Sequence, residues 1–193
     1  MSSDQGTDEN FSIKNSWKQT ELGEVLSFRN GKSSAKNKSE PDGKYPVYGA
    51  NGPIARTNDA LEEDPVIIVG RVGAYCGNVQ RTEEKCWATD NTMVVRAKEA
   101  ELNFVYYLLS ELNLQRYRTG TSQPLLTQTA IKDSEVELPT KSEQEKIGAL
   151  LNNIDETIAV NIQINSILQN LVQSLFKSMF VDYEPYEQFK DVD

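Results

Sequence analysis

The sequence predicts an α+β protein, in which a mixed β-sheet domain with flanking helices is followed by one long C-terminal helix. Three observations support this fold class. Short apolar runs separated by glycine and polar turns fill residues 45–96, and apolar residues then recur at spacings of three and four over 102–112. From residue 140 to 184 no proline interrupts a long periodic apolar pattern. Strands that precede helices along a chain are typical of an α+β domain.

The first part of the chain is expected to form a polar leader followed by short strands. Residues 1–14 are polar and are expected to be disordered. An apolar pattern over 17–28 begins the ordered part, and 31–44 has the composition of a loop. The β-branched run 66–69 predicts a buried central strand. The predicted strands are Tyr45–Tyr48, Val66–Val69, Tyr75–Val79, Cys86–Ala88 and Thr92–Arg96.

An amphipathic helix over 102–112 is expected to cover the sheet, because its apolar residues fall on one helical face. A polar, glycine-containing loop follows between Arg116 and Gln128, and a last strand, Glu135–Leu138, ends at Pro139. Residues 15–139 are therefore the predicted domain.

The helix predicted over 140–181 is too long to be covered by a domain of this size. Ser142 to Glu145 has the pattern of a capping box, and about 40 helical residues would span roughly 60 Å. An apolar stripe of this width requires more than one neighbour, although the helix could instead fold back as a core helix. An acidic tail, 182–193, ends the chain. Steps of seven give the columns Ile147, Ile154, Asn161, Leu168, Leu175 and Leu150, Thr157, Ile164, Leu171, Ser178, widened by Leu151, Ile158, Val172 and Met179.

Several residue types and motifs of catalysis are missing. The 193 residues include no histidine, which removes histidine-dependent catalysis and the usual zinc ligand sets. No phosphate-binding Gly-x-x-x-x-Gly-Lys-Ser/Thr loop and no Asn-Pro-Pro-aromatic tetrapeptide occurs. We therefore expect no cofactor, no metal and no catalysis by the chain alone. An alternative is a metal-dependent nuclease that uses Asp59 with Glu83, Glu84 and Lys85.

Cysteine content and hydropathy favour a cytoplasmic protein. No apolar run is long enough for a membrane span, and residues 1–10 lack the apolar core of a signal peptide. Cys76 and Cys86 are expected to be reduced, half-buried thiols rather than a disulfide.

The net charge of −9 opposes binding to nucleic acid, but the distribution of charge is uneven. Eight of the acidic residues lie in the two short tails. Six basic residues and two acids lie between Arg29 and Arg56, and three basic residues without an acid lie between Gln115 and Lys132. These two basic islands would form one positive face if folding brought them together, and would otherwise be solvated loops.

An ordered series of short motifs resembles the specificity subunits of type I restriction-modification systems. The series covers about residues 17–180, and no single motif in it is specific. It consists of Trp17 with 22–25, then 45–52, 69–73, 77–78, 88–91, 120–123, 138–139, 143–147, 154–155 and 175–180.

The resemblance implies a target-recognition domain that reads double-stranded DNA. It also implies a conserved helix that pairs with a second such helix and docks methyltransferase subunits and, through them, restriction subunits. Family members usually carry two of each part, whereas this sequence has one and no internal repeat. We therefore expect a half-subunit that forms a homodimer through an antiparallel coiled coil and reads an interrupted palindrome, or else a fragment. A second class of function is an interaction protein that blocks or mimics such a subunit.

Each candidate site residue has a structural alternative. Arg71 would contact a guanine edge or a phosphate, or else clamp a loop. Asn51 has the character of a turn residue with positive φ, or else contacts adenine or the DNA backbone. Lys32, Lys36 and Lys38 would contact phosphates, or else be solvated. Tyr75 would belong to the DNA surface, or else to the core. The candidate DNA-binding residues are Lys32, Lys36, Lys38, Asn51, Arg56, Arg71, Tyr75, Asn91, Arg116, Arg118 and Gln123. The candidate dimer residues are Ile147, Leu151, Ile154, Ile158, Asn161, Ile164, Leu168, Leu171 and Leu175. Asn161 and Asn165 would lie near the two-fold axis, or else face solvent or a partner subunit.

Overall fold

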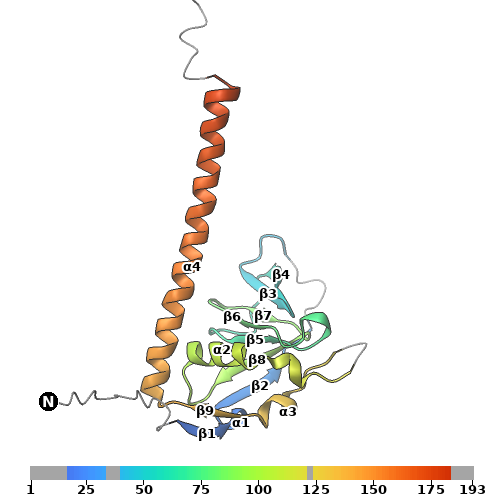
Figure 1. Ribbon diagram of the computed structural model, residues 1–193. Helices are drawn as coiled ribbons and strands as arrows, with labels where there is room; N and C mark the ends of the chain where they lie inside the picture. The colour runs from blue at the N-terminus through green and yellow to red at the C-terminus, as the bar shows by residue number, and fades with distance from the viewer. Residues whose placement is uncertain (1–16, 34–39, 121–123, 184–193) are drawn as a thin grey trace, which may run out of the picture. The chain divides into compact units, whose positions relative to one another are not determined.

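The computed structural model describes residues 17–33, 40–120 and 124–183, which fold into two compact units that divide between Ala149 and Leu150. The first unit contains three small sheets (Figure 1). The first sheet pairs β1 (Lys18–Glu21) with β9 (Glu135–Leu138). The second has the order β2 (Leu26–Asn30), β8 (Thr92–Ala97), β5 (Ile67–Gly70), β6 (Val79–Arg81), and the third has the order β4 (Gly52–Thr57), β3 (Tyr45–Gly49), β7 (Trp87–Ala88).

The strands pair in both parallel and antiparallel directions, as the prediction of a mixed β-sheet domain requires. All pairs of the second sheet are antiparallel, whereas β3 of the third sheet pairs with β4 antiparallel and with β7 parallel. The predicted buried central strand is confirmed as β5, which lies between β8 and β6 and is fully buried. With the long C-terminal helix, this arrangement confirms the predicted α+β class.

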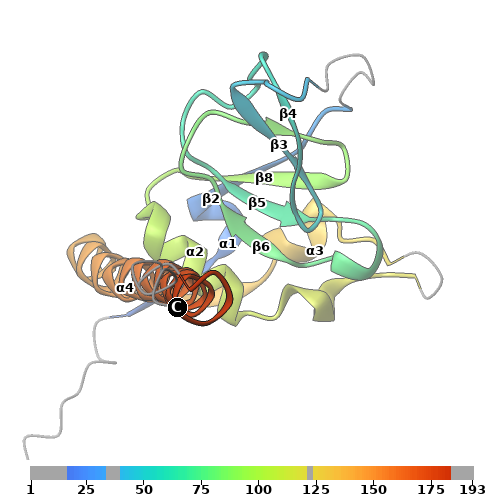
Figure 2. The same cartoon turned by 90° about the horizontal axis from the view of Figure 1, so that it is seen from above.

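The second sheet lies between two apolar layers. One face carries Ile67, Val69, Met93 and Val95, which pack in the main core with residues of the helices α1 (Leu22–Val25), α2 (Leu102–Glu111) and α3 (Gln128–Lys132). Val94 and Ile68 point to the opposite face, where they pack with Val66, Cys86, Ala88 and Tyr48. Figures 1 and 2 show the third sheet on that side. Because successive side chains of a strand alternate in direction, one buried strand serves both layers.

The prediction that the two cysteines form no disulfide is confirmed, because both are free. The expectation of half-buried thiols was wrong, since both are completely buried, in different core clusters. Burial raises the pKa of Cys86 to about 11.

Several local predictions were wrong. A strand over 75–79 is replaced by a 3-10 helix, Gly73–Tyr75, and a turn before β6, because Gly73 and Gly77 adopt φ of +74° and +90°. These are conformations that break a strand. Strand β4 was missed because glycine and proline begin it. The loop expected over 116–128 is shortened by the 3-10 helix η4 (Leu114–Tyr117) and by α3.

The long helix is confirmed as α4 (Lys141–Phe176), which continues into a π-helical turn, Lys177–Val181. Its cap differs from the prediction. Glu143 Oε2 accepts hydrogen bonds from the backbone N–H and the hydroxyl of Thr140, at 2.9 and 2.7 Å, so the capping pair begins at Thr140 rather than at Ser142.

The first turns of α4 belong to the domain unit. Gln144 is buried, donates to Pro139 O and accepts from the backbone N–H of Glu101. A Cβ atom at Gly148 would lie 2.9 Å from the backbone nitrogen of Phe104. Ile147 packs against the main core. The glycine therefore allows α4 to approach the start of α2 closely.

Candidate nucleic-acid interface

Several loops meet at one end of the second sheet. Gly70 pairs with Thr92 and Asn30 pairs with Met93, so the end of β2, the end of β5 and the start of β8 coincide. We call this end the rim. It consists of residues 31–33, 50–51, 71–78, 89–91 and 115–120.

Arg71 is fixed at the rim on both sides of its backbone. Its N–H donates to Asn91 O at 3.0 Å, and its carbonyl accepts from the N–H of Leu126 at 2.8 Å. Its Nη1 donates to Asp90 O at 3.2 Å, while its buried Nε has no partner among the described residues. The guanidinium is thus held beside exposed Asn91, with donors left for a ligand.

Lys32 reaches the same rim from β2. Its backbone N–H donates to Ala88 O at 2.9 Å, and its carbonyl accepts from Trp87 Nε1 at 3.0 Å. Since the backbone is held twice and the side chain is exposed, the ammonium group is presented to solvent.

The turn between β3 and β4 carries Asn51, which is exposed. The residue with positive φ is Gly52, at +123°, so the expectation of a left-handed Asn51 was wrong; glycine adopts this conformation at lower cost. Asn51 Oδ1 accepts a hydrogen bond of 3.3 Å from Asn78 Nδ2. Tyr75, in the neighbouring turn, is 53% exposed and is therefore not a core residue.

Arg116 and Arg118 join the rim through η4. The backbone of Gln115 lies against Gly77, where a Cβ atom would come within 2.7 Å of Gln115 N. Arg116 lies over the ring of Tyr117, with Cζ 4.7 Å from its centroid, and donates to the Tyr117 hydroxyl. Arg118 donates its backbone N–H to Gln115 O at 3.2 Å, and its side chain is exposed.

Other predicted residues do not join the rim. Arg56 Nε donates to Gly43 O at 2.6 Å and its Nη2 donates to Lys44 O, so Arg56 holds a loop against β4. Lys36, Lys38 and Gln123 lie outside the described residues. The two basic islands therefore contribute only part of their charge to one surface.

The charged residues of the alternative nuclease site are paired elsewhere or exposed. Lys85 pairs with Glu63, and Asp59, Glu83 and Glu84 are exposed. Across residues 17–33, 40–120 and 124–183, no group of three or more His, Cys, Asp or Glu side chains could hold a metal ion.

Sequence reasoning missed two polar contacts. Buried Glu62 binds both Arg29 and Arg96, and Asn78 contacts Asn51. The strand predicted over 75–79 gave no sign of a contact between Asn78 and Asn51, and nothing around Glu62 indicated burial.

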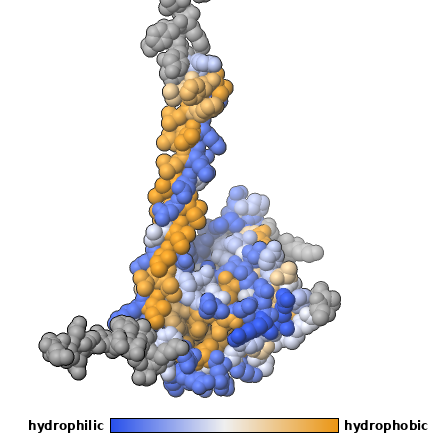
Figure 3. Space-filling view, viewed as in Figure 1, coloured by the Kyte–Doolittle hydropathy of each residue, from blue (hydrophilic) through white to orange (hydrophobic). Residues whose placement is uncertain are grey.

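The second unit presents a continuous apolar stripe, seen in Figure 3 along the helix. Its large apolar side chains are about half exposed, for example Ile154 at 48% and Leu168 at 51%. Within the described residues, no helix combines the length and hydropathy of a membrane span.

The stripe divides into two parts when it is followed along the helix. Residues spaced alternately by four and three form a seam, which is the heptad spacing of a coiled coil. Val160, Ile164, Ile167 and Leu171 form a flank about 100° away, given 3.6 residues per turn. Ile147 continues this spacing but belongs to the domain unit, where it packs against the main core. The seam consists of Leu151, Ile154, Ile158, Asn161, Asn165, Leu168, Val172, Leu175 and Met179.

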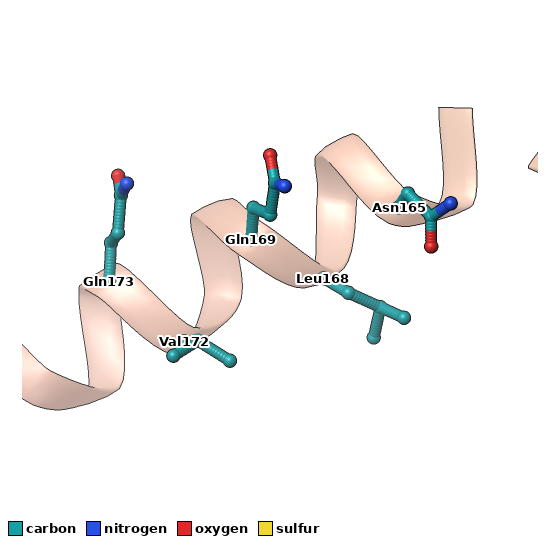
Figure 4. Close-up of a pocket in the computed structure, with 5 residues that line it drawn as sticks. All are labelled: Asn165, Leu168, Gln169, Val172 and Gln173. Carbon is teal, nitrogen blue, oxygen red and sulfur yellow. The ribbon is translucent and has the colours of Figure 1, made fainter. Parts of the chain in front are cut away.

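Two of the predicted dimer residues, Ile164 and Leu171, lie on the flank, and six lie on the seam. Ile147 packs against the main core of the domain unit instead. A shallow groove is lined by Asn165, Leu168, Gln169, Val172 and Gln173. Figure 4 shows Leu168 and Val172 on one side of the helix and the two glutamines on the other. The seam therefore has a polar border.

Comparison with known proteins gives consistent matches. A family model described as the type I restriction modification DNA specificity domain matches residues 14–170. The type I restriction enzyme EcoprrI specificity subunit of Escherichia coli is 29% identical over 143 residues, which are 72% of this chain and 36% of that protein. The EcoDI specificity subunit of Escherichia coli is 30% identical over 159 residues, which are 78% and 35%. The chain spans about a third of the length of these curated relatives.

Two solved structures share the fold. The S subunit of a type I restriction-modification system from M. genitalium has a TM-score of 0.73 and 20% identity, covering 92% of this chain and 50% of that chain. The HsdS subunit from Thermoanaerobacter tengcongensis has a TM-score of 0.56 and 19% identity, covering 87% and 46%.

Proposed function

Because this chain belongs to the family of type I restriction-modification DNA specificity domains, we propose that it is the non-catalytic DNA-recognition part of such a system. The observation that carries the proposal is the family match over 14–170, which includes every loop of the rim. We assign DNA recognition to residues 15–139 and assembly to residues 140–181. Since the target would be cellular DNA, the chain would work in the cytoplasm.

The rim is the proposed DNA surface. Lys32, Arg116 and Arg118 would neutralise phosphates, because their charges are exposed at the edge of the domain. Arg71 would contact a base edge or a phosphate, since its guanidinium is held in place and retains unused donors. Asn91 and Tyr75 would complete the contact surface. Each chain would thus bind one half-site.

We assign the seam to a second copy of the chain, which would run antiparallel. Support comes from the symmetry of the seam about Gln163. Reflection places Leu151 opposite Leu175, Ile154 opposite Val172, Ile158 opposite Leu168, and Asn161 opposite Asn165. Each of these apolar positions meets an apolar position, and the two asparagines meet at the two-fold axis. A buried polar pair of this kind fixes the register of a coiled coil.

The flank would dock a methyltransferase subunit, through which restriction subunits would join. It is apolar and would stay uncovered by a single partner helix, because a two-stranded seam buries a narrower stripe. A homodimer would present the flank twice and the rim twice, so its target would be an interrupted palindrome.

Selection from a random-sequence duplex pool, followed by co-expression with a methyltransferase subunit and methylome sequencing, tests this function. The expected result is an enriched palindrome with an unread spacer, methylated only when both proteins are present. If the chain pairs with specificity or methyltransferase subunits but enriches no sequence, the inhibitory alternative replaces this proposal. Methylation or cleavage by the chain alone would also contradict it.

A further inference from the structure

Two amide side chains meet at the rim, although they come from different turns. Asn78 Nδ2 donates to Asn51 Oδ1 over 3.3 Å. Asn51 is exposed and Asn78 is half-buried. In the part of the chain that the structure describes, no other hydrogen bond engages either amide group.

The backbones that carry these amides are fixed against each other. Asn51 lies in a two-residue turn closed by the pairing of Gly49 with Gly52. Asn78 donates its backbone N–H to Tyr75 O at 3.0 Å and accepts from Gly70 N–H at 2.8 Å. A Cβ atom at Gly70 would lie 2.5 Å from Ala50 O, so the two turns touch through their backbones. The fold therefore fixes the distance between the two backbones that carry these amides.

A primary amide presents an acceptor and a donor side by side, and adenine presents the complementary N6 donor and N7 acceptor in the major groove. The bond from Asn78 occupies one lone pair of Asn51 Oδ1. It leaves the second lone pair and both Nδ2 hydrogens of Asn51 unused. We infer that Asn51 reads an adenine of the half-site, with Oδ1 accepting from N6 and Nδ2 donating to N7. This inference rests on the proposed function, to which it adds one base of the target.

Asn78 acts as a positioning residue in this arrangement. An amide can rotate by half a turn and exchange its oxygen and nitrogen at little cost in shape. The Asn78 donor opposes an exchange of Asn51 alone, because the NH2 group of Asn51 would then face the NH2 group of Asn78. Exchanged, Asn51 would also face the adenine N6 donor with its own donor. The bond from Asn78 therefore favours the orientation of Asn51 that adenine requires, as long as Asn78 keeps its own orientation.

The test uses the full chain and the duplex that it enriches from a random pool. Each adenine of that duplex is replaced in turn by 7-deazaadenine, which lacks the N7 acceptor and retains base pairing. At one position the wild-type affinity should fall on the order of tenfold, the loss of one hydrogen bond to a base. With Asn51→Ala the same replacement should cause no further loss. Asn51→Asp, which keeps the size of the side chain, should behave in the same way.

Asn78→Ala should retain the affinity for unrelated DNA but lose most of the penalty for 7-deazaadenine. Asn78→Asp should lose this penalty completely. A carboxylate at residue 78 accepts a hydrogen bond from Asn51 Nδ2, which turns the Asn51 amide into the orientation that does not match adenine. Asn58→Ala is the matched control, since the Asn58 amide also bonds to a side chain, Glu40, and lies away from the rim. It should leave the penalty unchanged.

The experiment distinguishes failure of this inference from failure of the proposed function. If a sequence is enriched but every adenine shows the same 7-deazaadenine penalty with wild type and with both Asn51 variants, this inference is wrong and the proposed function stands. If no sequence is enriched, the proposed function is wrong and the inference falls with it.

Discussion

Arg96 Nη2 lies 2.7 Å from Oε2 of Glu62, a carboxylate whose side chain is completely buried. The other oxygen of Glu62 pairs with Arg29 Nη2. Arg29 belongs to β2 and Arg96 to β8, so one carboxylate joins two neighbouring strands to the loop that precedes β5. Burial, followed by the charge of Arg96, lowers the pKa of Arg29. The contact therefore holds a loop on the sheet.

Replacing Glu62 by Gln should lower the free energy of unfolding by about 1–3 kcal/mol, because charged hydrogen bonds to both arginines are lost. The loss stays moderate since the arginine side chains are 43% and 39% exposed and can be solvated. Urea denaturation measures it. The adjacent pair of Glu63 and Lys85 is exposed, so Glu63→Gln is the control and should cost less than about 1 kcal/mol. Equal losses for the two variants would contradict the role of burial.

The cap of α4 should make stability depend on pH. Hydrogen bonds from Thr140 lower the pKa of Glu143. A carboxyl group whose pKa is lowered by folding stabilises the folded state at a pH above the pKa that it has in the unfolded chain, which is about 4.3 for glutamate. This stabilisation is lost as the pH falls through the pKa of the folded state. Wild type should therefore be more stable than Glu143→Gln at pH 7, and the difference should shrink below about pH 4. Melting temperatures across this range measure the difference, and a constant difference would exclude the linkage.

Replacing Arg116 and Arg118 together by Ala should weaken DNA binding and flatten its dependence on salt. Each lost phosphate contact reduces the slope of log affinity against log salt concentration by about one. Lys85→Ala is the control, because Lys85 precedes β7 and pairs with Glu63 away from the rim. Fluorescence anisotropy at several salt concentrations measures the slope. An unchanged slope and affinity would remove η4 from the DNA surface.

Seam and flank should respond differently to charge. Leu168→Glu with Val172→Glu places charges in the seam and should give monomers that retain a folded domain, since the domain unit is separate from this part of the helix. Ile167→Glu with Leu171→Glu should leave the dimer intact and abolish co-purification with a methyltransferase subunit. Analytical ultracentrifugation and pull-down assays measure these results. A wild-type monomer at micromolar concentration would overturn the homodimer.

Local patterns in the sequence were sufficient to predict the α+β class, the buried strand β5, the helix α2 and the length of α4. Periodicity and proline placement act over a few residues, so they can be recognised without knowledge of the contacts. The same local reasoning failed at 75–79, where two glycines with positive φ turn the chain, and at the α4 cap, where Thr140 precedes the predicted residue.

The sequence alone also determined the residue types of the site, a set of arginines, lysines and amides in polar loops, and the family that these motifs resemble. Only the tertiary structure decided which of them lie together. Asn51 meets Asn78 across 27 residues and Glu62 meets Arg96 across 34, while Arg56 is held by the carbonyls of another loop. Such pairs depend on the register of strands that are distant in sequence, and register is set by packing of the whole core rather than by any local pattern.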